Sequence, residues 1–359
     1  MRHYIIILFL FISISSIAGR DSIPNFFIKG KFGYGALIRH RESMGNLMRH
    51  VGSMQIELGR QTNGIDLWEQ LYRYPEYGAG YYFANLGDPK LLGQVHALYA
   101  YLNSPFYRTK KFSLNYHFAI GASYITRKWD YKENYMNLAI GTHLNVYFNV
   151  HLNAAYRINK KIEIIGGIGA CHYSNGAIAQ PNLGINVANA DIGLRYYFNE
   201  YEEEFNKLEI PSCIKKNEFT VLYAVGTKSI PPPRGSNFFM SSLSLCFSRQ
   251  INHKRKIGGG TDIFYDETVY EESSKEEVRF KNALRNGIYV SHEFLIKKFS
   301  IGANLGIYTW YTEEPFFPLY TRLYFRYNVS KNFFTNISLK AHLGVADYIE
   351  WGLGYRFIK

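Results

Sequence analysis

The chain has 359 residues, enough for one large domain or two small ones, and they include 31 Tyr, 26 Phe and 31 Gly. After the first residues there is no second long apolar run, which excludes membrane-spanning helices. In a cytosolic protein, the formal net charge of +12 would suggest nucleic acid as the binding partner. In a protein with an export signal, the same charge favours binding to anionic lipid headgroups. We therefore expect a membrane as partner and no nucleic acid.

The N-terminus has the organisation of a signal peptide. Arg2 and His3 form a basic start, an apolar stretch runs from Tyr4 to Ile17, and small residues up to Ala18 provide a cleavage site. This stretch is shorter than the roughly 20 residues that span a bilayer. The sequence therefore predicts that residues 1–18 direct export and are removed.

Alternation of apolar and polar side chains is the main structural signal in the mature chain. Between 143 and 156 the even positions are apolar and most odd positions are polar, so an extended strand would have one apolar and one polar face. Similar runs occur near the C-terminus, at 319–328 and 349–357. A soluble β-sandwich also alternates, but its strands are usually shorter and less aromatic. The pattern predicts an all-β protein, an antiparallel transmembrane β-barrel.

About sixteen strands are predicted, in two repeats of eight. The first eight lie at about 25–39, 53–61, 77–86, 93–104, 112–125, 142–157, 161–174 and 187–198. We expect a first repeat at 19–198, a polar linker at 199–216 and a second repeat at 217–359. Sixteen strands can close as one large barrel around a channel, or as two small barrels whose lumens are filled by side chains.

The two halves also share short matches, such as 118–122 with 299–303. They favour a tandem duplication, although strands that obey one period resemble each other in any case.

The segment 171–186 departs from the simple alternation. His172 and Ser174 are two residues apart, so an extended backbone directs both side chains to one face, where imidazole can accept the serine proton. Asn186 on the adjoining strand is placed to orient the imidazole, as asparagine does in Cys-His-Asn triads. His172 and Ser174 share parity with Ile168 and the other apolar positions of their strand. We therefore expect this pair to face lipid, where a serine nucleophile would meet acyl esters.

The segment resembles the lipid A 3-O-deacylase (PagL-like) and acyloxyacyl hydrolase family of outer-membrane barrels. The residues that carry the resemblance are His-Tyr-Ser-Asn at 172–175, Gln-Pro-Asn at 180–182 and Gly184, and the resemblance covers about residues 23–198. It implies a serine esterase in the cell outer membrane that removes an ester-linked acyl chain from lipid A, within lipopolysaccharide of the outer leaflet. The chain also resembles the longer members of this family from Bacteroidetes-type bacteria, at Trp68, Tyr74, Pro75 and residues 78–80.

Carried over by position, the resemblance implies a role for each residue of the motif. His172 would be the base and Ser174 the nucleophile. Asn182 and the backbone N–H near Ala177 would form the oxyanion hole, which typically contributes about 3 kcal/mol per donor. The residues that would shape the turn are Asn175 and Gly176.

The chain departs from the family at one catalytic position, because Asn186 stands where the family has a glutamate. An amide can fix the tautomer of histidine but cannot stabilise imidazolium by charge. A slower enzyme, a substitute carboxylate and a loss of activity are therefore all open. Asp191 is the nearest acidic residue downstream, but its parity is inward.

The expected mechanism requires no cofactor, and the three cysteines have no metal-ligand spacing and suggest no disulfide framework. Basic residues at the rim that could hold lipid phosphates are Arg39, Arg41, Lys110 and Lys111, but a solvated loop edge is the commoner interpretation of such charges. His342 is one residue out of register with His172, so we assign no catalysis to the second repeat. The alternative function is a non-catalytic barrel, either a porin-like pore, a structural protein or a pseudoenzyme, and a homodimer is a further option.

Overall fold

The computed structural model describes residues 25–39, 49–201, 204–231, 237–273 and 279–358. The predicted signal peptide, residues 1–18, and Arg41 lie outside the described residues. Among the residues described, no helix is long and apolar enough to cross a membrane.

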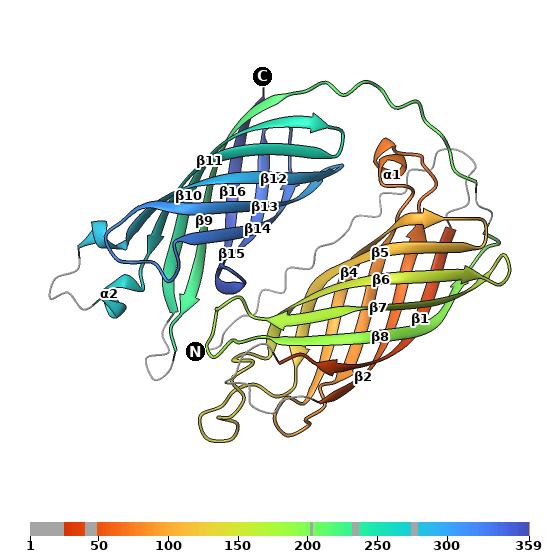
Figure 1. The fold of residues 1–359 in the computed structure, drawn as a ribbon, viewed down its shortest axis with the longest axis horizontal. Coiled ribbons are helices and arrows are strands. Elements are labelled where there is room, and N and C mark those ends of the chain that lie inside the picture. The colour runs from red at the N-terminus through yellow and green to blue at the C-terminus, as the bar shows by residue number, and fades with distance from the viewer. Residues whose placement is uncertain (1–24, 40–48, 202–203, 232–236, 274–278, 359) are drawn as a thin grey trace.

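Antiparallel strands form two closed barrels of eight, which lie next to each other (Figure 1). The strands of the first barrel are β1 (Asn25–Leu37), β2 (His50–Gln61), β3 (Glu76–Asn85), β4 (Gln94–Arg108), β5 (Phe112–Ile125), β6 (Leu144–Arg157), β7 (Ile162–Ser174) and β8 (Ile185–Tyr197). The strands of the second barrel are β9 (Asn217–Ser229), β10 (Asn237–Asn252), β11 (Arg255–Asp266), β12 (Leu284–Ile296), β13 (Phe299–Tyr311), β14 (Leu319–Asn328), β15 (Phe333–His342) and β16 (Val345–Ile358).

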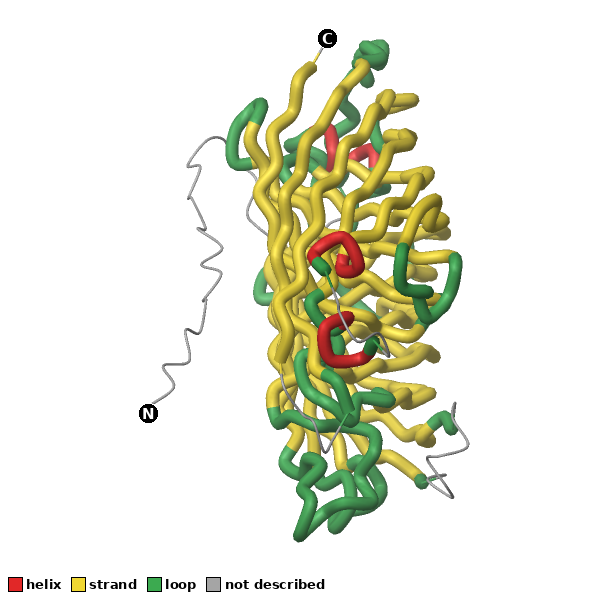
Figure 2. Tube along the Cα trace, turned by 90° about the vertical axis from the view of Figure 1, so that its left-hand side faces the viewer, coloured by secondary structure: helices red, strands yellow, loops and turns green. Residues whose placement is uncertain are grey.

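Each barrel closes on itself because its first strand pairs with its last, β1 with β8 and β9 with β16. The predicted all-β barrel fold with sixteen strands is confirmed, and two small barrels form rather than one large ring. Figure 2 shows that helical segments, in red, occur only in the connections. They are α1 (Leu67–Leu71), α2 (Val269–Glu272) and the short 3₁₀ helix η2 (Phe280–Ala283).

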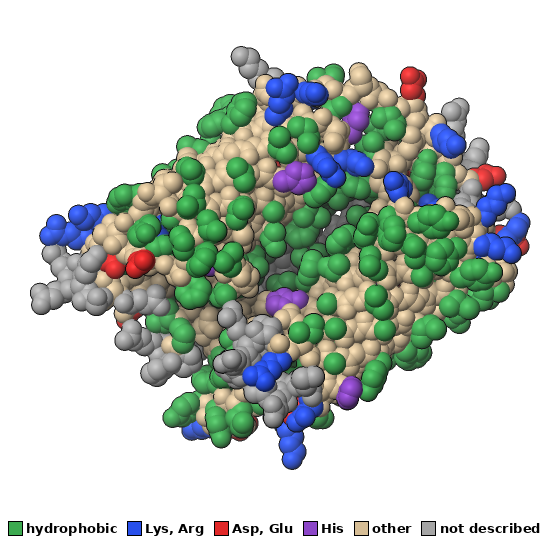
Figure 3. Space-filling view, in the orientation of Figure 1, with side chains coloured by type: hydrophobic (Ala, Val, Ile, Leu, Met, Phe, Trp, Pro, Cys, Tyr) green, Lys and Arg blue, Asp and Glu red, His purple; other side chains and the backbone are tan. Residues whose placement is uncertain are grey.

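The two faces of the strands differ as the alternation predicts. On β6, Leu144 and Leu152 are exposed on the outer wall, whereas Asn149 and His151 are buried in the lumen. Figure 3 shows hydrophobic side chains spread over the outer walls of both barrels, with most charged side chains near the barrel ends. Such a surface suits a barrel that faces lipid outside and is polar inside.

Buried ion pairs fill the lumen of the first barrel. Lys29 Nζ lies 3.2 Å from a carboxylate oxygen of Glu57 and 3.1 Å from one of Glu76. Arg195 forms ion pairs of 2.7 Å with both Glu76 and Glu163. These side chains cross the interior, so the lumen is a packed polar core rather than a wide channel.

The second barrel has a comparable core. Arg322 is 1% exposed and lies 3.0 Å from a carboxylate oxygen of Asp262 and 2.7 Å from one of Glu350. Ser242 and Ser338 donate hydrogen bonds to the two oxygens of Glu350. The buried carboxylates are therefore paired and hydrogen-bonded, as burial of charge requires.

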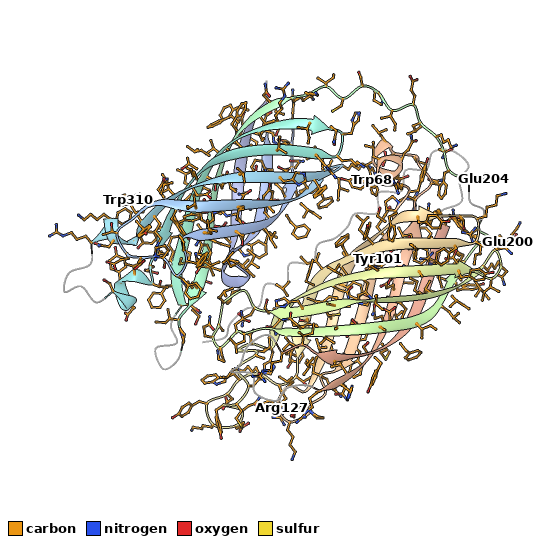
Figure 4. All side chains as sticks on the ribbon, viewed as in Figure 1. Trp68, Tyr101, Arg127, Glu200, Glu204 and Trp310 are labelled. Atoms are coloured by element: carbon orange, nitrogen blue, oxygen red, sulfur yellow. The ribbon has the colours of Figure 1, made fainter. Side chains whose placement is uncertain are left out.

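Consecutive antiparallel strands place their connections alternately at the two ends of a barrel. In the first barrel, the connections 126–143 and 175–184 follow β5 and β7 and lie at the same end. Figure 4 shows Arg127 at this end and Glu200 and Glu204 at the opposite end. We call the end with 175–184 the motif end.

Candidate active site

The three residues expected to form the site lie in one chain of hydrogen bonds. His172 Nε2 is 2.9 Å from Ser174 Oγ, and His172 Nδ1 is 2.6 Å from Asn186 Oδ1. Ser174 is two residues beyond His172 on β7, and Asn186 on β8 is the direct cross-strand partner of His172. The sheet thus brings together the serine, histidine and asparagine side chains that the sequence analysis expected to meet, each through ordinary strand geometry.

The amide oxygen of Asn186 fixes the roles of the two ring nitrogens of His172. An amide oxygen only accepts hydrogen bonds, so Nδ1 of a neutral imidazole carries the proton in this pair. The other nitrogen, Nε2, then has a free lone pair and faces the hydroxyl of Ser174. This tautomer is the one that can take a proton from a serine nucleophile.

The site is on the outer wall, at the motif end of the first barrel. Ile168 on β7 and Ile192 on β8 share the face of His172 and Asn186 and are 64% and 65% exposed. Phe148, opposite His172 on β6, is also exposed. Ser174, which is 9% exposed, therefore lies beside an apolar surface and not in the polar lumen.

Asp191 cannot take the place of the missing glutamate. Its carboxylate is buried in the lumen, 2.9 Å from Lys31 Nζ and 3.3 Å from His151 Nδ1. Because successive side chains of a strand point to opposite faces, Asp191 and Asn186 lie on opposite sides of β8. The parity argument is confirmed, and Asn186 is the side chain that contacts Nδ1 of His172.

The turn after Ser174 is held by side-chain amides. The backbone N–H of Asn175 donates to Asn182 Oδ1 at 3.0 Å. Asn175 Nδ2 donates to the carbonyl of Ala179 at 2.9 Å and to Thr142 Oγ1 at 3.1 Å. Asn175 is 3% exposed, so these bonds are shielded from water. Asn182 of the expected oxyanion hole is thus close to the backbone that follows Ser174.

Gly184 allows the histidine to approach the turn. Its φ is +82°, a conformation that favours glycine, and a Cβ atom at this position would lie 2.9 Å from His172 Cε1. The N–H of Gly184 donates to the carbonyl of Ala139 at 2.9 Å. Any other residue here would therefore press on the imidazole.

The β5–β6 connection supports the site, and sequence reasoning did not identify it. Thr142 contacts the side chain of Asn175, and Ala139 accepts the bond from Gly184. Both residues are more than 30 positions from the residues that they hold. Their sequence context contains no motif, so only the closed barrel reveals this support.

The basic residues expected at the rim do not lie together. Arg39 follows β1 and lies at the motif end, whereas Lys110 and Lys111 form the turn between β4 and β5 at the opposite end. Lys110 and Lys111 are therefore not placed to hold the phosphates of a lipid whose acyl ester lies at Ser174. The order of the predicted strands already implies this, because the turn at 110–111 falls between the fourth and fifth strands and the motif between the seventh and eighth.

Two further expectations concern residues outside the triad. His342 is buried in the second barrel, where its Nε2 lies 3.0 Å from the hydroxyl of Tyr308. In the described part of the chain, no group of three or more His, Cys, Asp or Glu side chains is arranged to hold a metal ion. The three cysteines, at 171, 213 and 246, are free thiols.

Two family models match the chain over most of its length. The model described as lipid A 3-O-deacylase (PagL) matches residues 54–195, and the model described as acyloxyacyl hydrolase, C-terminal domain, matches residues 217–359. These ranges fall on the first and the second barrel. The chain belongs to the lipid A 3-O-deacylase and acyloxyacyl hydrolase family. This membership supports an ester hydrolase of the lipid A deacylase type at the level of the family.

Other comparisons are more distant. A search of the curated proteins gives no match. Neisserial surface protein A (NspA) is 10% identical with a TM-score of 0.33, covering 48% of this chain and 97% of its own. The toluene transporter TodX of P. putida is 8% identical with a TM-score of 0.19, covering 94% of this chain and 89% of its own. At such TM-scores these similarities carry no information about function.

Proposed function

We propose that the protein is an outer-membrane serine esterase that hydrolyses an ester-linked acyl chain of lipid A. The observation that carries this proposal is the hydrogen-bonded chain from Ser174 through His172 to Asn186 on an apolar outer wall. A nucleophile at this position meets the acyl esters of a lipid that lies alongside the barrel. Family membership supports the same substrate class.

The reaction follows the pattern of acyl transfer by serine. Ser174 Oγ attacks the ester carbonyl carbon, and His172 Nε2 takes the hydroxyl proton. The oxyanion receives hydrogen bonds from the amide of Asn182 and from the backbone N–H near Ala177. The intermediate collapses, the C–O bond to lipid A breaks, and the leaving alkoxide takes the proton from His172. A water molecule, deprotonated by His172, then attacks the acyl-serine. The bond between the acyl carbon and Ser174 Oγ breaks, His172 returns the proton to Oγ, and the fatty acid is released.

Asn186 limits how well this site can stabilise charge. After the first proton transfer His172 is an imidazolium ion, and the amide of Asn186 offers it a hydrogen bond but no negative charge. We therefore expect a slower enzyme than a site with a carboxylate at this position. The same residue is the observation that favours a pseudoenzyme as the second candidate.

The outer-membrane assignment rests on the apolar walls and on the predicted signal peptide. The buried ion pairs of both lumens argue against the porin-like alternative, since Lys29, Arg195 and Arg322 with their carboxylates occupy the barrel interiors. The substrate would then approach through the outer leaflet, where lipopolysaccharide is the lipid at hand.

Expression in a Gram-negative host, followed by mass spectrometry of its lipid A, tests the proposal. Wild-type protein is expected to remove one acyl chain, and Ser174→Ala is expected to leave lipid A intact while it folds and inserts normally. Folding of both proteins is verified on a denaturing gel, where a folded barrel migrates differently before and after heating. Intact lipid A in cells that contain folded wild-type protein would refute the esterase function.

A further inference from the structure

The turn that follows the nucleophile contacts the second barrel. The backbone N–H of Ser229, at the end of β9, donates to the carbonyl of Ala177 at 2.9 Å. Ile349 on β16 packs against Gly176 so closely that a Cβ atom on this glycine would overlap the isoleucine side chain. Thr227 of β9 pairs with Ile349, so both contacts come from one place on the second barrel.

These contacts fall on the part of the turn whose backbone conformation is unusual. Gly176 and Ala177 are consecutive residues with φ of +62° and +64°. For alanine this left-handed conformation is unfavourable, because its Cβ approaches the following carbonyl. Ala177 is nevertheless only 2% exposed and has its carbonyl bonded to the other barrel. The second barrel therefore supports a conformation that the turn does not favour by itself.

A second set of contacts joins the barrels at the opposite end of the first barrel. The hydroxyl of Tyr72, directly after α1, donates to the carbonyl of Leu295 at 2.9 Å. Lys297 forms a 2.6 Å ion pair with Asp66, directly before α1. Figure 4 shows Trp68 of α1 on the side of the first barrel that faces the second. The barrels are thus connected at two separate places, so the contact at the turn belongs to an extended interface.

We propose that the second barrel is a positioning element for the catalytic turn of the first. Ser229 and Ile349 hold Gly176 and Ala177 in the conformation that presents the backbone N–H groups of the turn to the oxyanion. Neither residue touches the reacting atoms in this role. The inference rests on the proposed esterase function, and it gives a function to a barrel to which the sequence assigns no catalysis.

Kinetics of the full-length protein on lipid A in mixed micelles test this role. In Ile349→Ala the side chain against Gly176 is lost, and we expect kcat to fall about tenfold with KM unchanged, because the turn loses its productive geometry. Ile349→Val should keep most of the activity. The matched control is Leu353→Ala, on the same face of β16 and 71% exposed, which should behave as wild type.

The outcomes separate the possible failures. An unchanged kcat in Ile349→Ala overturns the inference, and so does a rise in KM alone, which would make Ile349 a substrate contact. A wild-type protein without activity overturns the proposed function and this role with it.

Cross-linking provides a readout that does not depend on activity. A small aliphatic diazirine amino acid at position 349 should form an intramolecular cross-link to the peptide around Gly176, detected by mass spectrometry after digestion. The same group at position 353 should not do so. Absence of the cross-link at position 349 would overturn the inference even if wild-type protein hydrolyses lipid A.

Discussion

Replacement of Asn186 by leucine is the most informative test of the triad. The two side chains have similar size, and Asn186 is half-buried on the outer wall, so leucine fits the surface without opening a cavity. The change removes the oxygen that lies 2.6 Å from His172 Nδ1 and leaves Ser174 in place.

The size of the effect follows from the charge that His172 acquires. A hydrogen bond between neutral groups contributes about 1 kcal/mol net, whereas a bond from a charged donor contributes about 1.5–3 kcal/mol. The imidazolium ion exists only after Ser174 has given up its proton, so the stronger bond acts in the transition state. Because the resting enzyme already has the neutral bond, worth about 1 kcal/mol, the transition state loses about 0.5–2 kcal/mol more than the free enzyme, which corresponds to a decrease in kcat/KM of roughly 2- to 30-fold.

Initial rates of fatty-acid release from lipid A micelles measure this effect. Ala190→Leu is the matched control, because it adds a leucine to the same exposed face of β8 without touching His172. A rate for Asn186→Leu equal to that of wild type would refute the orienting role. A loss as complete as that of Ser174→Ala would contradict the magnitude, since one hydrogen bond cannot account for it.

The remaining predictions concern charge, sterics and the lumens. Asn186→Asp should raise kcat, because a carboxylate stabilises the imidazolium ion that forms on His172 by charge as well as by a hydrogen bond; a lower rate would contradict this. Gly184→Ala should lower kcat by up to about 100-fold, because its Cβ displaces the ring of His172, and steady-state kinetics would measure the loss. Arg322→Met should destabilise the second barrel by about 3–5 kcal/mol, measured by unfolding in detergent, because two buried carboxylates lose their cation. Wild-type protein in planar bilayers should give no large open channel, since Arg195 and Arg322 lie across the lumens; steady porin-like conductance would contradict the packed interiors.

The candidate site could be predicted in part because its central residues obey local rules. His172 and Ser174 are two positions apart on one strand, so alternation alone places them on the same face and predicts which face it is. The same rule places Asp191 on the opposite face of its strand from Asn186, which excludes it as a partner of His172. That Asn186 reaches Nδ1 depends on the register between β7 and β8, which the ten-residue connection 175–184 does not fix.

The period of the strands, their approximate bounds, the polar interior and the wall position of the motif follow from the amino-acid sequence alone, because each depends on neighbours along the chain. Closure into two barrels, the support from Thr142 and the contact between Ser229 and Ala177 emerge only from the folded chain. These features depend on pairing between residues far apart in sequence, for which alternation carries no information.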